Sequence, residues 1–62
     1  MKKDEIQKGK IYHNGKGQER RVIQIKKLEG YKYADVIYET AGIYDCLDLL
    51  DFAKWAKGEK KP

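Results

Sequence analysis

The sequence has one cysteine, one proline and no apolar run long enough to cross a membrane. Cys46 therefore cannot form a disulfide within the chain, and together with His13, the only histidine, it cannot complete a zinc-binding set. Because the proline is the last residue, no strand or helix is interrupted by proline. With no disulfide, signal peptide or membrane span, the sequence predicts a cytoplasmic protein that has no membrane contact, metal or cofactor.

The chain length of 62 residues limits the size of the core. A chain this short buries only about 60% of the surface that it exposes when unfolded, and such a core rarely supplies more than ~3–5 kcal/mol. Hydrophobic residues make up 40% of the chain, which excludes wholesale disorder. We expect a single domain over residues 1–62, folded at about 9–58, with polar basic tails at both ends. Association into a homodimer is one way for such a domain to gain stability.

The net charge of +4 is unevenly distributed along the chain. Residues 1–10 carry a charge of +2 and residues 54–62 carry +3, whereas residues 11–53 have six basic and seven acidic side chains. A basic chain invites a nucleic-acid interpretation. Lysines near chain ends, however, usually serve solubility, and the central region is nearly neutral. The charge distribution therefore weakens that interpretation.

Apolar and polar residues alternate in several short segments, which is typical of β-strands separated by turns. The expected strands cover residues 10–13, 18–28, 33–40 and 43–47. The Asn-Gly dipeptide at 14–15 is the strongest short-range hairpin signal, and further turns are expected at 29–32 and 40–42. These short, regularly spaced strands favour a small barrel or a strongly bent sheet.

The stretch RRVIQIKK, residues 20–27, is either a basic strand for a phosphate backbone or a half-buried strand with its charges in water. A four-residue turn at 29–32 gives antiparallel partners whose numbers sum to 61. The inner face then pairs Ile25 with Val36 and Ile23 with Tyr38, and the outer face pairs Lys26 with Asp35, Gln24 with Ile37 and Val22 with Glu39. This register matches lysine with aspartate outside and apolar residues inside, so it favours the half-buried strand.

A short helix is expected after the last strand. Asp48 is a good N-cap, and Asp51 follows at the spacing of a capping box. Apolar residues then recur at helical spacing, and Gly58 is placed to end the helix. The predicted fold class is therefore mainly β: a small SH3-like barrel or strongly bent antiparallel sheet of about four strands, with one short C-terminal α-helix.

Four short motifs, Gly9-Lys10-x-Tyr12, Arg21-Val22-Ile23, Val36-x-Tyr38 and Phe52-Ala53-x-Trp55-Ala56, resemble a pattern in small uncharacterised open reading frames of phages and prophages. The resemblance covers about residues 9–57. It implies an SH3-like β-barrel that ends in a helix, and an accessory protein of a phage or mobile element in a bacterial host cell. It implies no activity, because small barrels of this kind bind RNA, DNA or proteins.

No pattern in the sequence points to catalysis. His13 and Cys46 are the only candidates for a nucleophile and its base, and nothing supplies a third, orienting group. In the D-x-x-D-x-x-D run of Asp45, Asp48 and Asp51, the last two are accounted for by helix capping and the helix dipole. The glycine-rich residues 14–17 lack the spacing of a phosphate-binding loop. We expect a non-enzymatic protein with no metal site.

Aromatic and basic residues are the candidates for binding. They are Tyr12, Tyr31, Tyr33, Tyr44 and Trp55, with Arg20, Arg21 and Lys32 beside them. Because tyrosine, tryptophan and arginine are enriched at interface hot spots, the favoured partner is a protein. The resemblance to phage proteins implies a host protein, which the chain would bind and modulate by occlusion. The alternative is a DNA- or RNA-binding SH3-like module, with tyrosines stacking on bases and basic residues contacting phosphates. An exposed strand edge would also accept a partner strand or a second copy.

Overall fold

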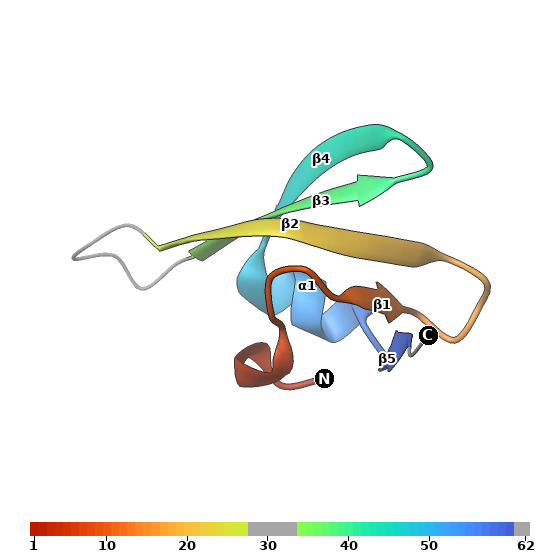
Figure 1. Cartoon of the computed structure of the whole chain (residues 1–62). Helices are drawn as coiled ribbons and strands as arrows, with labels where there is room; N and C mark the ends of the chain where they lie inside the picture. The colour runs from red at the N-terminus through yellow and green to blue at the C-terminus, as the bar shows by residue number, and fades with distance from the viewer. Residues whose placement is uncertain (28–33, 61–62) are drawn as a thin grey trace.

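The computed structural model, which describes residues 1–27 and 34–60, contains five antiparallel strands in one sheet and a short α-helix. The strands are β1 (Ile11–His13), β2 (Glu19–Lys27), β3 (Ala34–Thr40), β4 (Ile43–Asp48) and β5 (Gly58–Lys60). The helix α1 (Leu49–Trp55) lies between β4 and β5 in the chain, and a 3₁₀ helix, η1 (Lys3–Glu5), precedes β1. The strand order across the sheet is β4-β3-β2-β1-β5, and α1 contacts β3, β4 and η1 (Figure 1).

The mainly β class and the short helix are confirmed, whereas the number of strands is five instead of about four. In the described part of the chain, β4 and β5 lie at opposite ends of the strand order and do not pair with each other. The sheet is therefore open. Of the two forms that we expected, a small barrel or a strongly bent antiparallel sheet, it does not form the closed barrel.

The predicted register between β2 and β3 is confirmed at one end and wrong at the other. The pairs Lys26–Asp35, Ile25–Val36 and Gln24–Ile37 are present, but the register then shifts, so that Val22 pairs with Tyr38 and Arg21 with Glu39. Ile23 is the extra residue of a β-bulge, which reverses the faces of the residues before it. Val22, expected on the outer face, is consequently buried in the core.

The core lies between the sheet and α1. Its fully buried large side chains are Tyr12, Val22, Val36 and Phe52. The rings of Tyr12 and Phe52 meet edge to face, with their centroids 5.9 Å apart. The Tyr12 hydroxyl accepts a hydrogen bond from the Gln7 N–H at 2.7 Å and donates one to the Glu5 carbonyl at 2.9 Å. Tyr12 therefore joins β1 to the segment that follows η1.

Both ends of the chain, which we expected to be polar tails, take part in the fold. Near the start, Ile6 is buried, and the Met1 ammonium donates hydrogen bonds of 2.9 Å to the carbonyls of Ala53 and Ala56 at the end of α1. Near the other end, β5 pairs with β1. Contacts between residues so far apart in the chain leave no periodic signal in the sequence.

The start of α1 is as predicted, and its end is not. The Asp48 side chain accepts a hydrogen bond from the Leu50 N–H at 2.9 Å, which confirms the N-cap. The helix ends at Trp55, and Gly58 is the first residue of β5 instead of the helix terminator. A Cβ atom at Gly58 would lie 2.8 Å from Nε2 of His13, so glycine allows β5 to approach β1 closely.

The turn at 14–17 is confirmed. The Asn14 side-chain oxygen accepts hydrogen bonds from the N–H groups of Lys16 and Gln18, and both Gly15 and Gly17 have positive φ angles. The predicted turn at 29–32 lies outside the described residues.

Candidate functional site

The structure distributes the predicted binding residues among very different environments. Tyr12 is 0% exposed, so it offers no surface to a partner and is instead a core residue. Tyr44 is 63% exposed on β4. Arg21 is exposed and pairs with Glu39 at 2.6 Å. Tyr31, Lys32 and Tyr33 lie outside the described residues.

Arg20 and Trp55 contact each other and are both half-buried. The guanidinium carbon of Arg20 lies 4.1 Å from the centroid of the Trp55 ring and 4.6 Å from that of Tyr38. The Arg20 Nη1 atom is buried and has no hydrogen-bond partner within the described ranges. This stacking of a cation between two aromatic rings joins β2, β3 and α1. Arg20, which we expected at the rim of a binding surface, is thus half-buried and packs against aromatic rings within the fold.

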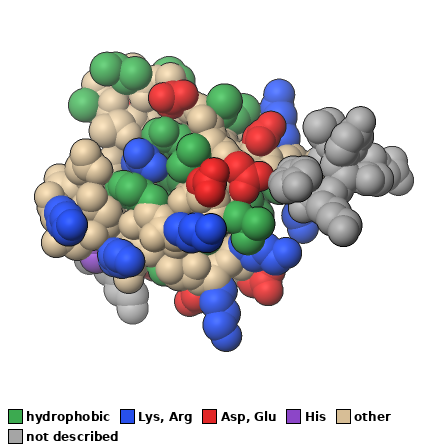
Figure 2. Space-filling model, turned by 180° about the vertical axis from the view of Figure 1, so that it is seen from behind, with side chains coloured by type: hydrophobic (Ala, Val, Ile, Leu, Met, Phe, Trp, Pro, Cys, Tyr) green, Lys and Arg blue, Asp and Glu red, His purple; other side chains and the backbone are tan. Residues whose placement is uncertain are grey.

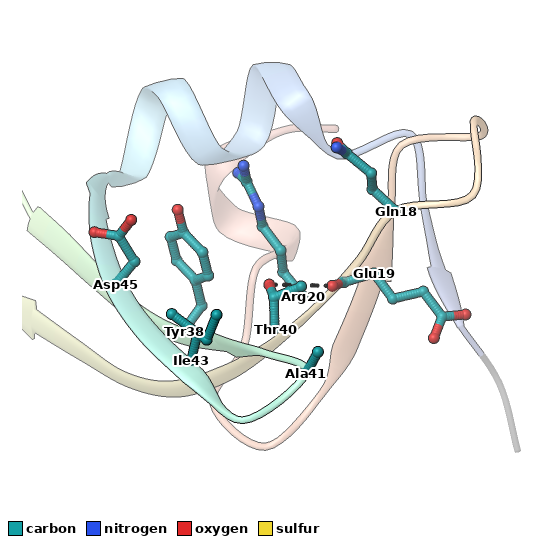
Figure 3. A pocket seen from close by; sticks show the side chains of 8 residues that line it. All are labelled: Gln18, Glu19, Arg20, Tyr38, Thr40, Ala41, Ile43 and Asp45. Carbon is teal, nitrogen blue, oxygen red and sulfur yellow. Dashed lines mark hydrogen bonds between the residues drawn. The ribbon is translucent and has the colours of Figure 1, made fainter.

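A pocket of about 320 Å³ opens beside Arg20, at the small end of the range for ligand sites, ~300–1,000 Å³ (Figure 3). Arg20 and Tyr38 point from the sheet toward α1, and β4 contributes Ile43 and Asp45. The described residues hold no group of three or more His, Cys, Asp or Glu side chains arranged to bind a metal.

The strand β4 forms one edge of the sheet, and most of its side chains are exposed. Ile43 is 70% exposed, and Leu50, just beyond the strand, is 48% exposed. Figure 2 shows hydrophobic side chains at the surface along the top of the molecule, where Figure 1 places β4. Exposed apolar side chains on an edge strand mark an interaction surface more often than scattered single residues do.

The backbone of β4 has donors and acceptors that face away from β3. The turn from Thr40 to Ile43 has two central residues with positive φ, Ala41 at 51° and Gly42 at 83°, as in a type I′ hairpin. In the antiparallel ladder that follows, alternate residues bond to β3, which leaves the backbone of Tyr44 and Cys46 facing outward. The outward N–H of Cys46 donates a hydrogen bond of 2.8 Å to Oδ1 of Asp45. One position of this edge is therefore capped by a side chain.

Acidic residues gather around β4. Residues 34–53 contain five acidic side chains and no lysine or arginine, whereas the rest of the chain has fourteen basic and five acidic residues. The five acids are Asp35, Glu39, Asp45, Asp48 and Asp51. Because β3 and β4 are neighbours at one end of the strand order, the fold places four of these charges on the last two strands of the sheet, whereas Asp51 lies on α1. The nearly neutral residues 11–53 thus consist of a basic region, residues 11–33, followed by an acidic region, residues 34–53.

Two basic side chains near the opposite edge of the sheet, at β1 and β5, are in ion pairs with glutamates. Lys10 lies 2.9 Å from Glu59, and Lys60 lies 3.1 Å from Glu19. The hydrogen bond and the charge of Glu59 raise the pKa of Lys10 above its usual value. These pairs interrupt the continuous basic stripe that a phosphate backbone requires.

Comparisons with protein-family models, with curated proteins and with solved structures found no match. Within residues 1–27 and 34–60, no helix has the length and hydrophobicity needed to span a bilayer.

The free thiol of Cys46, which we expected in the core or on a strand, is exposed on β4. The sequence signals for this site were the β-forming residues 43–44 and the absence of lysine and arginine from residues 34–53.

Proposed function

We propose that this chain is a small non-catalytic binding protein that accepts an extended segment of a partner protein as an additional strand along β4. The observation that carries the proposal is that β4, a six-residue edge strand, pairs with β3 alone among the described residues and exposes Ile43 and Tyr44. Soluble proteins usually shorten, charge or cover such edges. Strand addition is a common mode of peptide recognition, in which main-chain hydrogen bonds give affinity and side-chain pockets give specificity.

The two faces of β4 would contact the added strand differently. Ile43 and Asp45 lie on the face with the pocket, so a partner side chain on that face would pack toward Tyr38. Tyr44 lies on the opposite face and is the exposed aromatic residue best placed to act as a hot spot. Binding of this kind modulates a partner by occlusion and requires no chemistry on the part of this chain.

The resemblance to phage and prophage proteins supports a host protein of the bacterial cell as the partner. The strand order β4-β3-β2-β1-β5, in which the last strand returns to the first, supports an SH3-like description of the sheet. The runner-up function is DNA or RNA binding through the basic residues outside 34–53.

A backbone variant of the edge tests the proposal. Cys46→Pro removes the outward N–H and places a ring in its position, a change that edge strands tolerate. Cys46→Ser is the matched control, because it keeps the N–H. A photo-crosslinking amino acid at position 44 is expected to capture a protein from bacterial lysate in the Cys46→Ser background. The same amino acid in the Cys46→Pro background is expected to capture none.

The opposite edge and nucleic acid provide the remaining controls. A crosslinker at position 60, on β5, is expected to capture nothing in the same lysate. Equal capture in the proline and serine backgrounds would exclude strand addition along β4, because the partner would then not need the outward N–H of residue 46. Binding of short DNA or RNA tighter than ~1 μM at about 150 mM salt would favour the nucleic-acid alternative instead.

A further inference from the structure

We infer that the segment added to β4 is an apolar strand with two basic residues three positions apart, one beside Asp45 and one beside Asp48. This inference rests on the proposed function, and it specifies the chemistry of the partner. It follows from the rows of side chains that run across the sheet from strand to strand, because a residue in an added strand packs against the end of each row.

Two of these rows end on an aspartate. On one face, Lys26 pairs with Asp35 and Asp35 with Asp48, so two like charges adjoin at the edge. Like charges directly opposite each other are destabilising, and a cation beside Asp48 would offset this repulsion. On the other face, the row Val22–Tyr38 ends on Asp45. Because Asp45 and Asp48 are three residues apart, their side chains lie on opposite faces of the strand.

The remaining rows end on residues that are apolar or of low polarity. Rows through Thr40, Val36, Ile37 and Glu39 end on Ile43, Leu47, Cys46 and Tyr44. A partner residue beside these positions gains most by being apolar, since Ile43 and Tyr44 are largely exposed in the free protein. The edge therefore specifies both the charge of the partner strand and the spacing of that charge.

Asp45 also discriminates against partner strands that lack a basic residue at this position. Its carboxylate accepts the outward N–H of Cys46 at 2.8 Å, so a strand that lacks a cation at this position must compete with that bond. A lysine or arginine beside Asp45 draws the carboxylate to itself and releases the N–H for a partner carbonyl. Asp45 is thus a specificity-determining residue that disfavours neutral strands.

A second copy of the chain fits this edge poorly. Two β4 strands placed edge to edge bring together regions that each contain five acids and no basic residue. The other edge, β5, has three residues, and the cations Lys10 and Lys60 beside it are in ion pairs with Glu59 and Glu19. The charge complementarity therefore points to a different protein as the source of the strand.

Synthetic peptides test the inference directly. The first probe is a peptide of about eight residues, mostly valine and threonine, with two lysines three positions apart. The second has the same composition with the lysines two positions apart, so that both lie on one face, and the third replaces both lysines with glutamate. Titration followed by backbone amide shifts at residues 43–48 is expected to give a lower Kd for the first peptide than for the second, and no binding of the third.

Charge-neutral variants provide the matched test on the protein. Asp45→Asn and Asp48→Asn keep the side-chain shape, and asparagine also caps helices well. Each is expected to raise the Kd of the first peptide about 2- to 5-fold, the range for exposed ion pairs. Asp51→Asn makes the same change in charge on α1, away from the edge, and is expected to leave the Kd unchanged.

The outcomes separate this inference from the proposed function. Equal affinity for the first two peptides, binding of the glutamate peptide, no binding of any peptide, or self-association through β4 would each overturn the inference. If Cys46→Pro still abolishes capture of the lysate protein in those cases, strand addition at β4 stands and only the partner chemistry is wrong. If Cys46→Pro leaves that capture intact, strand addition itself is wrong.

Discussion

The guanidinium carbon of Arg20 lies 4.1 Å from the centroid of the Trp55 ring, although the two residues are 35 positions apart in the chain. Arg20 also lies 4.6 Å from the centroid of Tyr38, and the Trp55 N–H donates a hydrogen bond of 3.3 Å to Gln18. The contact holds the end of α1 against β2 and β3. A positive charge in this position therefore stabilises the packing of α1 on the sheet.

Replacement of Arg20 should therefore lower stability more than replacement of its neighbour Arg21. Arg20→Ala removes the cation–π contacts, each worth ~0.5–2 kcal/mol, together with the packing of the aliphatic stem. We expect a decrease of about 1–2 kcal/mol in the free energy of unfolding. Because Trp55 is the only tryptophan, its emission should also shift to longer wavelength in the folded variant. Arg21→Ala loses one exposed ion pair, worth ~0.2–1 kcal/mol, and should leave the emission unchanged.

The hydroxyl of Tyr12 gives a second pair of matched variants. Tyr12→Phe leaves the Gln7 N–H and the Glu5 carbonyl without their partner, which should cost about 1–3 kcal/mol. Tyr44→Phe makes the same chemical change at an exposed position, where we expect a change within ~0.5 kcal/mol. Urea denaturation of both proteins compares the two values. Equal costs would mean that the Tyr12 hydroxyl makes no net contribution.

The β3–β4 turn should be open to stabilisation. Ala41 has a φ of 51°, a conformation that costs ~1–2 kcal/mol for most residues with a side chain. Ala41→Asn creates an Asn-Gly pair, the preferred type I′ sequence, and should raise stability by about 0.5–1 kcal/mol. Gly42→Ala, at a φ of 83°, should lower it by about 1–2 kcal/mol. Thermal unfolding of the two variants should show opposite shifts in Tm.

The ion pair between Lys10 and Glu59 predicts a pH dependence. Since the folded-state pKa of Lys10 is raised by Glu59, the pair adds stability below the unfolded-state pKa, and this stability is lost as the pH rises through the folded-state pKa. Glu59→Gln should lower the pKa of Lys10 toward its usual value, as measured by NMR titration of the side-chain nitrogen. Glu19→Gln is the control, because Glu19 pairs with Lys60, and it should leave the pKa of Lys10 unchanged.

Much of the secondary structure follows from local patterns. The Asn-Gly turn at 14–15 and the N-cap at Asp48 are both present, because each depends on side chains within a few residues of one another. The Lys26–Asp35 pair also has a local basis, since alternation in the two adjacent segments predicted its register. Farther along the same strands, the bulge at Ile23 changes the register, and alternation alone did not predict it.

The binding residues were predicted less well. Residue type indicated Tyr12 and Tyr44 equally, yet one is buried and the other is the exposed aromatic of β4. The environments of Tyr12 and Arg20 depend on Phe52 and Trp55, which belong to α1. Because these contacts join residues far apart in the chain, the local spacing of residues does not predict them.

The amino-acid sequence by itself determined the mainly β class, most strand positions, the start of the helix and the uneven charge along the chain. Those features arise from the period of the side chains and from short-range hydrogen bonds. The tertiary structure decided the open sheet, the pairing of β5 with β1, the burial of Tyr12 and the position of the acidic residues along one edge. These depend on which distant segments pack together, a choice governed by burial of the core as a whole.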